Sequence, residues 1–124
     1  MPVDVVLVAE RLAKKHRDMA HFVFQEVSLS LPSGRLVALL GPSGIGKTTL
    51  LSLFALMDQP DGGYLYYHGE HTAAWSELQK AQWRLRQLGY MPQHSIWITH
   101  LTLYDNLMLR SSATGYTHAL VVSA

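Results

Sequence analysis

The sequence predicts an α/β fold in which an apolar strand leads through a glycine-rich loop into a helix. Residues 36–40, "LVALL", form a continuous apolar run of strand length, as expected for a strand that is covered on both faces. The loop "GPSGIGKT" follows directly, and residues 47–57 then show helical periodicity. The apolar face of this helix carries Leu50, Leu53, Phe54 and Met57. The order of strand, loop and helix is the main evidence for the fold class.

Further elements are predicted on both sides of this unit. Before it, residues 3–8 are a short β-branched strand candidate, and residues 22–31, "FVFQEVSLSL", alternate like a half-buried strand. After it, a turn at residues 60–63 leads into a strand and hairpin tip, "YLYYHGE". Residues 74–88 suit a helix that ends at Gly89 as its C-cap. The apolar side of that helix carries Trp75, Leu78, Ala81, Leu85 and Leu88.

A last helix is predicted to begin near Thr102. Thr102 and Asp105 have the spacing of a capping box, in which the side chains at the two positions satisfy free backbone N–H groups. The same run, "LTLYDN", superficially resembles an apolar strand that ends in an acidic Mg²⁺ ligand. We favour the helix cap because Asn106, and not a glutamate base, follows Asp105. Residues 111–124 show no clear pattern.

Length and composition restrict the function classes. The chain has 124 residues, of which 48% are hydrophobic and 15% charged, so it is long enough to bury a core. The formal net charge of +1 provides no strong field, and no nucleic-acid partner is predicted. The absence of cysteine excludes disulfides and thiolate metal sites. No apolar run reaches the roughly 20 residues of a membrane helix, and residues 1–10 do not resemble a signal peptide, so any membrane role would come through a partner.

The glycine-rich loop has the composition of a phosphate cradle. Gly41, Gly46, Lys47 and Thr48 satisfy the pattern G-x-x-x-x-G-K-[ST]. Glycine permits positive φ and close approach, so successive N–H groups and the positive end of the following helix face an anion. Lys47 can reach the β- and γ-phosphates, and the Thr48 hydroxyl can hold Mg²⁺. The alternative, a glycine turn without a ligand, is disfavoured by the strand and helix on either side. The predicted nucleotide-binding residues are Gly41, Pro42, Ser43, Gly44, Ile45, Gly46, Lys47, Thr48 and Thr49.

The residues around this loop resemble the ATP-binding subunits of ABC transporters. The segment "VSLSLPSGRLVALLGPSGIGKTTLL" is similar to that family's lead-in, P-loop and first helix nearly position by position. The segment "LGYMPQHSIWITHLTLYDNLML" resembles its Q-loop region, and the resemblance covers roughly residues 6–109. Residues 75–106 and those before Phe22 are most similar to the lipoprotein-release and macrolide-efflux branch. Polar amino-acid importers share several of the same features.

The resemblance implies an α/β fold of the P-loop NTPase class, ABC type, that is incomplete. Residues 1–110 would be the N-terminal portion of an ABC ATP-binding domain, from P-loop to Q-loop, and residues 111–124 a tail that departs from the family. It also implies ATP and Mg²⁺ as ligands, a membrane permease subunit and a second ATP-binding subunit as partners, and a cytoplasmic location, peripheral on that face of the membrane.

Two further residue roles are implied by the resemblance. Gln93 would be the Q-loop glutamine, which senses the γ-phosphate side of Mg²⁺ and couples to the membrane subunits; Thr48 and Gln93 are thus the predicted metal residues. Without the family, Gln93 is a polar residue at a strand end. His16 aligns with the aromatic residue that stacks on adenine, and the alternative is a solvated loop histidine.

The family's catalytic features are absent from this sequence. Full-length subunits are about twice as long, and their second half carries an LSGGQ signature, an apolar strand ending in Asp-Glu, and a switch histidine. We therefore predict no catalytic residue and leave hydrolysis open for a chain that resembles a truncated subunit. The alternative is a non-hydrolysing nucleotide-binding remnant or regulator. A small P-loop kinase is disfavoured, because no acidic acceptor-binding cluster or basic lid cluster follows the loop.

Two other groupings are interpreted without site chemistry. The segment "HGEH", residues 68–71, lacks the i, i+4 histidine pair of a helical zinc site and is read as a solvent-facing hairpin tip. Trp75, Trp83 and Trp97 are far apart in the sequence, which favours core or partner packing over base stacking.

Overall fold

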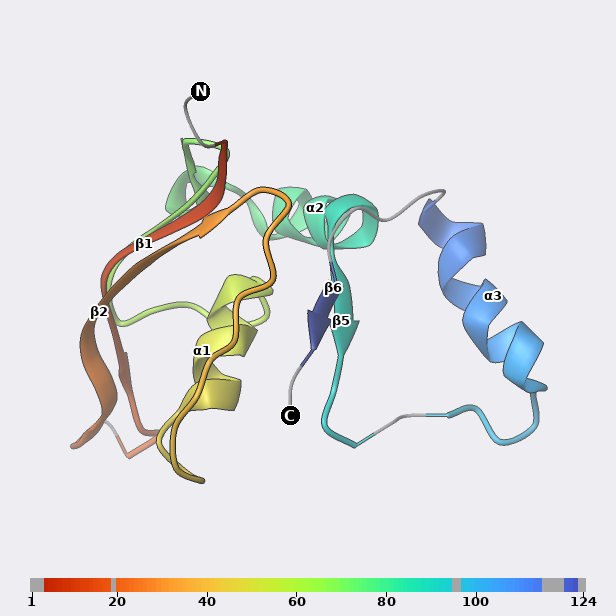
Figure 1. The fold of residues 1–124 in the computed structure, drawn as a ribbon, viewed down its shortest axis with the longest axis horizontal. Coiled ribbons are helices and arrows are strands. Elements are labelled where there is room, and N and C mark those ends of the chain that lie inside the picture. Colours follow the sequence, from red (N-terminus) through yellow and green to blue (C-terminus); the bar gives the residue numbers. More distant parts are fainter. Residues whose placement is uncertain (1–3, 19, 95–96, 115–119, 123–124) are drawn as a thin grey trace. The chain divides into compact units, whose positions relative to one another are not determined.

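A computed structural model describes residues 4–18, 20–94, 97–114 and 120–122. The chain divides into two compact units, residues 1–76 and 77–124, and each is described by itself. Both helices and strands are present, so the predicted α/β class is confirmed (Figure 1). The elements are β1 (Val5–Lys15), β2 (Phe22–Pro32), α1 (Lys47–Phe54), β3 (Gly62–Tyr67), β4 (Glu70–His71), the 3-10 turn η1 (Thr72–Ala74), α2 (Glu77–Gln87), β5 (Gly89–Met91), α3 (Leu103–Thr114) and β6 (Leu120–Val122).

The first unit is built on a four-stranded sheet in the order β2-β1-β3-β4, with every neighbouring pair antiparallel. The predicted strands before and after the glycine loop are thus confirmed, and β1 is longer than the sequence indicated. The tip between β3 and β4 is a two-residue turn in which His68 and Gly69 both have positive φ, at 48° and 80°. This geometry is typical of a tight hairpin and confirms the predicted hairpin tip.

The core of the first unit lies between the sheet and α1. Its buried apolar side chains are Leu7, Ala9, Leu12, Leu50, Leu53, Phe54, Ala55, Leu56, Leu65 and Tyr67. The predicted helical face of α1 is therefore confirmed for Leu50, Leu53 and Phe54, whereas Met57 lies beyond the helix end and is exposed. The Tyr67 hydroxyl donates a hydrogen bond to the Phe54 carbonyl oxygen, which joins β3 to the end of α1. Burial raises the pKa of Tyr67, so this hydroxyl stays protonated and donating.

Bulges interrupt β1 and β2 at adjacent positions. Arg11 and Glu26 have φ of 50° and 53°, and the register shifts between Ala9 and Leu12 and again between Leu12 and Lys14. Their side chains form an ion pair of 2.9 Å, which contributes little because both are exposed. The neighbouring Gly63 has φ of 80°, and a Cβ there would lie 2.3 Å from the Arg11 carbonyl oxygen. Glycine is therefore required where β3 passes the bulge.

Lys14 attaches the connection between α1 and β3 to the sheet. Its ammonium lies 2.9 Å from the Asp58 carboxylate and 3.7 Å from that of Asp61, and it donates a 2.7 Å hydrogen bond to the Gln59 carbonyl oxygen. Burial alone would raise the pKa of Asp58, but hydrogen bonds from Lys14 and from the Gln59 N–H outweigh it and lower that pKa. The charged form of Asp58 is thus the form that the fold stabilises.

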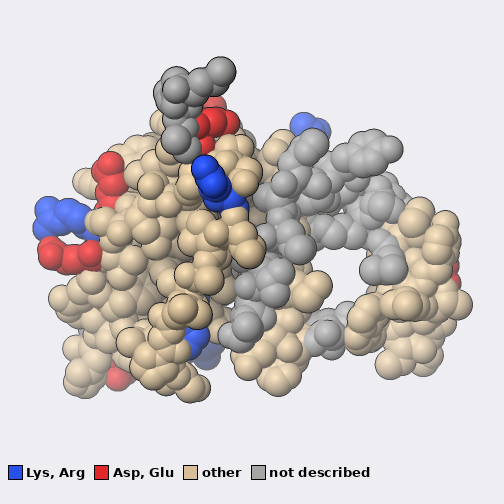
Figure 2. All heavy atoms as spheres, in the orientation of Figure 1, with Lys and Arg blue, Asp and Glu red and all other residues tan. Residues whose placement is uncertain are grey.

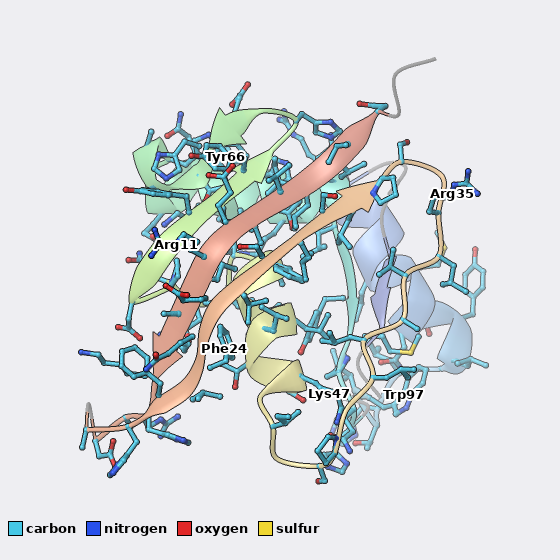
Figure 3. All side chains as sticks on the ribbon, turned by 60° about the vertical axis from the view of Figure 1, so that its left-hand side comes forward. Arg11, Phe24, Arg35, Lys47, Tyr66 and Trp97 are labelled. Carbon is cyan, nitrogen blue, oxygen red and sulfur yellow. The ribbon has the colours of Figure 1, made fainter. Side chains whose placement is uncertain are left out.

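The strand predicted at residues 36–40 is not formed, so that prediction was wrong. Residues 35–42 have no regular secondary structure and link the end of β2 to the glycine loop (Figures 1 and 3). Leu36 is 100% exposed and Leu40 88% exposed. A strand covered on both faces needs neighbouring strands on its edges, and the described part of the first unit supplies none to this segment. The apolar run is present, but its pairing partners are not.

The second unit contains α2, α3 and a parallel pair of strands, β5 and β6, in which Gly89 is opposite Leu120. The predicted C-cap role of Gly89 was wrong: α2 ends at Gln87, and Gly89 begins β5 without positive φ. The predicted apolar side of α2 was also wrong in part, because Leu78 and Leu85 are exposed and only Leu88, just past the helix, is buried. The lysine Lys80 is buried there and pairs with Glu77 at 2.8 Å.

The predicted capping box at the start of α3 is confirmed. The Asp105 N–H donates to the Thr102 hydroxyl oxygen at 3.1 Å, and the Asp105 carboxylate accepts from the Thr102 N–H at 3.3 Å. The helix begins at Leu103, and β6 occupies part of the tail in which the sequence showed no pattern. Of that tail, residues 115–119 and 123–124 lie outside the described residues.

Charged side chains are sparse on the face drawn in Figure 2, where acidic and basic groups lie near one another among mostly uncharged residues. Among the described helices, none combines the length and the apolar character required to span a bilayer.

Candidate nucleotide-binding site

The glycine loop presents the uncapped start of a helix. Gly44 and Gly46 have φ of 80° and 105°, which turn the chain sharply into α1 at Lys47. The first helical hydrogen bond runs from the Leu50 N–H to the Gly46 carbonyl oxygen at 2.9 Å. No side chain caps the first turn, and that turn carries no acidic residue. The N–H groups at this end therefore favour an anion.

Lys47 lies across its own loop. Its ammonium donates to the Gly41 carbonyl oxygen at 2.6 Å and to the Pro42 carbonyl oxygen at 2.9 Å (Figure 3 labels Lys47). An ammonium has three donors, so one is left for a phosphate oxygen. The two carbonyl bonds hold the positive charge beside the N–H groups of the loop. The ammonium is thereby positioned for a phosphate without a further side-chain partner.

The loop rests on the first residues of β2. A Cβ on Gly46 would lie 2.6 Å from Val23 Cγ1 and 3.2 Å from Phe24 Cδ1, so these side chains form the wall behind the last glycine of the motif. Sequence reasoning assigned Val23 and Phe24 only to a strand and missed this contact. The signal in the sequence was Gly46 itself. A glycine required by the motif indicates a position where a neighbouring residue lies too close for a side chain.

The remaining loop residues are exposed or half-buried. Ser43, Gly44 and Ile45 are exposed, and the Ile45 N–H bonds the Pro42 carbonyl oxygen at 3.4 Å. Thr48 is the second residue of α1 and is exposed, so its hydroxyl has room to bind a metal ion. Thr49 is half-buried in the same turn. A threonine hydroxyl is the kind of hard oxygen ligand that Mg²⁺ accepts in such loops.

His16 lies in the turn between β1 and β2. It is exposed, and its backbone N–H donates to the His21 carbonyl oxygen at 2.8 Å. In the same turn, the Ala20 N–H lowers the pKa of Asp18, and His21 adds to this effect. The structure gives the imidazole of His16 no ring partner among the described residues, and its stacking on adenine stays a prediction.

Gln93 is exposed and follows β5 by two residues, which confirms the predicted position at a strand end. It belongs to the second unit, whereas Thr48 belongs to the first. A joint Mg²⁺ site of these two residues therefore stays a prediction. Within the described residues there is no group of three metal-ligating side chains.

The sequence matches the ABC transporter family over residues 24–122, and the chain belongs to this family. It is 44% identical over 82 residues to the sulfate/thiosulfate import ATP-binding protein CysA of Pectobacterium atrosepticum, covering 66% of this chain and 23% of that protein. The CysA of Pseudomonas aeruginosa is 42% identical over 82 residues, with 66% and 23% covered. The chain therefore spans about a quarter of the length of these relatives.

Solved structures share the fold. One is the dimeric bacterial ABC transporter cassette MJ0796, with a TM-score of 0.76, 24% identity, and 84% of this chain and 46% of that chain covered. Another is described as the ATP-binding subunit of an ABC transporter, with a TM-score of 0.71, 27% identity, and 89% and 43% covered. The predicted family and its P-loop NTPase fold, present here as the N-terminal part, are thus confirmed. The resemblance to the lipoprotein-release and macrolide-efflux branch stays a prediction.

Proposed function

We propose that this chain binds ATP·Mg²⁺ through residues 41–49, as the nucleotide-binding part of an ABC transporter. The observation that carries the proposal is the position of the Lys47 ammonium, bonded to the Gly41 and Pro42 carbonyl oxygens at the uncapped start of α1. A triphosphate would gain the loop N–H groups, the helix end and one cation together. The Thr48 hydroxyl would bind the Mg²⁺ that the triphosphate brings.

A transport role requires a membrane permease as partner. This chain would bind the permease on the cytoplasmic face of the membrane. The second unit offers exposed apolar side chains after Gln93, among them Trp97, Ile98, Leu103 and Tyr104. Asn106 fixes this loop, because its amide oxygen accepts from the Ile98 N–H at 2.9 Å and its amide N–H donates to the Thr102 carbonyl oxygen at 2.9 Å. A fixed, apolar loop beside the Q-loop glutamine supports the permease as partner. In the full-length family a second ATP-binding subunit would join the same assembly.

ATP turnover by this chain alone is not part of the proposal. Phosphoryl transfer to water requires a positioned water and charge stabilisation in the transition state. The sequence holds no glutamate after a strand-end aspartate and no LSGGQ signature. Hydrolysis would require catalytic motifs that these 124 residues do not contain. A nucleotide-binding remnant or regulator without hydrolysis remains the second candidate, because the phosphate loop is complete while the catalytic motifs are missing.

The test is a titration of the full chain with a fluorescent ATP analogue in the presence of Mg²⁺. Lys47→Ala removes a charge-assisted hydrogen bond worth about 1.5–3 kcal/mol, so affinity should fall by roughly 10- to 150-fold. Arg86→Ala, which removes an exposed cation from α2 in the other unit, is the matched control and should leave affinity unchanged. Equal affinities for the chain and Lys47→Ala would disprove the proposed cradle.

A further inference from the structure

Asp61 bonds the end of β1 with both its backbone and its side chain. It lies in the connection from α1 to β3, and α1 itself begins in the phosphate loop. The Asp61 N–H donates to the Ala13 carbonyl oxygen at 2.9 Å, and its carboxylate accepts from the Lys15 N–H at 2.8 Å. The Lys14 ammonium lies 3.7 Å from the same carboxylate. One residue therefore attaches the end of β1 to the chain that leaves the phosphate-loop helix.

The turn between β1 and β2 starts directly after the strand end that Asp61 holds. The His16 N–H donates to the His21 carbonyl oxygen at 2.8 Å, which closes this turn. β2 follows at once, and its second residue, Val23, lies against Gly46 of the phosphate loop. The turn and the phosphate loop are thus neighbours within the first unit.

The turn carries planar side chains that a nucleobase could stack on. His16 and His21 are exposed, and Phe22 is 42% exposed. Two of these rings already have partners, because the Lys15 ammonium lies 5.4 Å from the Phe22 ring centroid and His21 Nδ1 lies 3.6 Å from the Asp18 carboxylate. The imidazole of His16 has no ring partner among the described residues. It is therefore the ring of the turn that is available to a base.

We infer that Asp61 is a positioning residue for the base of a bound nucleotide. It holds the end of β1 so that His16 faces the base when the phosphates lie in the loop, and this inference rests on the proposed ATP binding by residues 41–49. The Asp61 carboxylate acts through the Lys15 N–H and not on the nucleotide itself. Its removal should therefore weaken the binding of nucleotides and spare a ligand that consists of phosphates only.

Calorimetric titration of the full chain with ATP·Mg²⁺ and with Mg²⁺-tripolyphosphate separates the two ends of the site. Stacking on one ring contributes a factor of roughly 5 to 150, so Asp61→Ala should lower ATP affinity about 5-fold or more. Tripolyphosphate affinity should stay unchanged, which also shows that the variant is folded. Asp61→Asn, which keeps an oxygen for the Lys15 N–H, should retain most of the ATP affinity.

Asp58→Ala is the matched control in the same connection. Asp58 accepts from the Lys14 ammonium at 2.9 Å, and its other hydrogen bond is to the adjacent Gln59 N–H. This variant loses an ion pair with the end of β1 but keeps the bond to the Lys15 N–H. The affinities for ATP and for tripolyphosphate should both stay unchanged.

Two further readouts distinguish positioning from a merely structural role. In the unsubstituted chain, ATP but not tripolyphosphate should slow hydrogen exchange at residues 15–18, and this measurement does not depend on the folding of any variant. Adding Asp61→Ala to His16→Ala should cause no further loss of ATP affinity, because the ring that Asp61 positions is already absent.

The inference is overturned if Asp61→Ala weakens ATP and tripolyphosphate equally or leaves ATP affinity unchanged. It is also overturned if the losses of Asp61→Ala and His16→Ala add, or if tripolyphosphate slows exchange at residues 15–18 as much as ATP does. Binding of both ligands that is unaffected by Lys47→Ala would disprove the phosphate cradle, and this inference with it, so the two failures are distinguishable.

Discussion

Gly46 is required at the phosphate loop for two physical reasons, its positive φ and the close approach of β2, and the substitution Gly46→Ala tests both. At φ of 105°, any residue with a Cβ is strained, at a cost of about 1–3 kcal/mol. The new Cβ would also lie 2.6 Å from Val23 Cγ1 and 3.2 Å from Phe24 Cδ1, and such overpacking adds about 1–3 kcal/mol. Gly46→Ala should therefore lower the free energy of unfolding by about 2–6 kcal/mol.

Gly44 is the matched control in the same loop. Its φ is 80°, but a Cβ there would meet nothing within 4 Å, so Gly44→Ala carries the backbone cost alone, about 1–2 kcal/mol. Combining Gly46→Ala with Val23→Ala removes the closest contact and should recover part of the steric cost. In a double-mutant cycle, which subtracts the cost of Val23→Ala alone, the recovery should be about 1 kcal/mol.

The assay is urea unfolding followed by circular dichroism, with nucleotide affinity measured in parallel. It compares the unsubstituted chain, the three single variants, and Val23→Ala combined with each glycine substitution. Gly46→Ala should be less stable than Gly44→Ala, and only Gly46→Ala should respond to Val23→Ala. Equal losses for the two glycines, or a cycle with no coupling between residues 46 and 23, would refute the contact between β2 and the loop as the reason for this glycine.

Three further predictions concern turnover, acid stability and helix capping. Phosphate release from ATP by the purified chain should equal that of Lys47→Ala; turnover that survives purification and disappears in this variant would contradict it. Because the pKa of Asp58 is lowered from its ordinary 3.8, its contribution to stability is present above that pH and is lost as the pH falls through the lowered value. Lys14→Met should therefore reduce the urea midpoint at pH 7 more than at pH 2, and an equal reduction would argue against the ion pair. Thr102→Ala should destabilise α3 by about 1 kcal/mol while Thr102→Ser, which keeps the hydroxyl, does not; circular dichroism during urea unfolding compares them.

Much of the candidate site could be read from the sequence because the phosphate loop is local. The motif specifies the positive φ of Gly44 and Gly46 and the helix start at Lys47, because these features depend only on neighbouring residues in the sequence. The Thr102 cap was predictable for the same reason. The wall formed by Val23 and Phe24 was not, because it depends on a strand about twenty residues earlier, and no pattern within β2 indicates what its side chains contact.

The wrong predictions also have a physical cause in missing or distant partners. Residues 36–40 have strand composition, but a strand forms only when another strand accepts its hydrogen bonds. Gly89 lies just after the end of α2, but it belongs to a strand because it pairs with β6. The sequence of β6 shows no pattern that predicts a strand. In α2, helical spacing identified an apolar side that includes Leu78. Spacing alone does not show whether another element covers that side, and Leu78 is exposed.

The bulge at Arg11 also determines how tolerant β1 is to changes in length. Leu7 and Ala9 are buried two residues apart, as alternation requires, but the next buried residue, Leu12, comes after three. The bulge absorbs the odd residue, so both parts of the strand face the same core. Deleting Arg11 would leave Leu7, Ala9 and Leu12 in simple alternation, and the pairs Leu12–Val27 and Ala13–Gly62 would follow Ala9–Leu29 and Glu10–Tyr64 without a bulge. Related sequences should therefore tolerate the loss of one residue between Ala9 and Leu12.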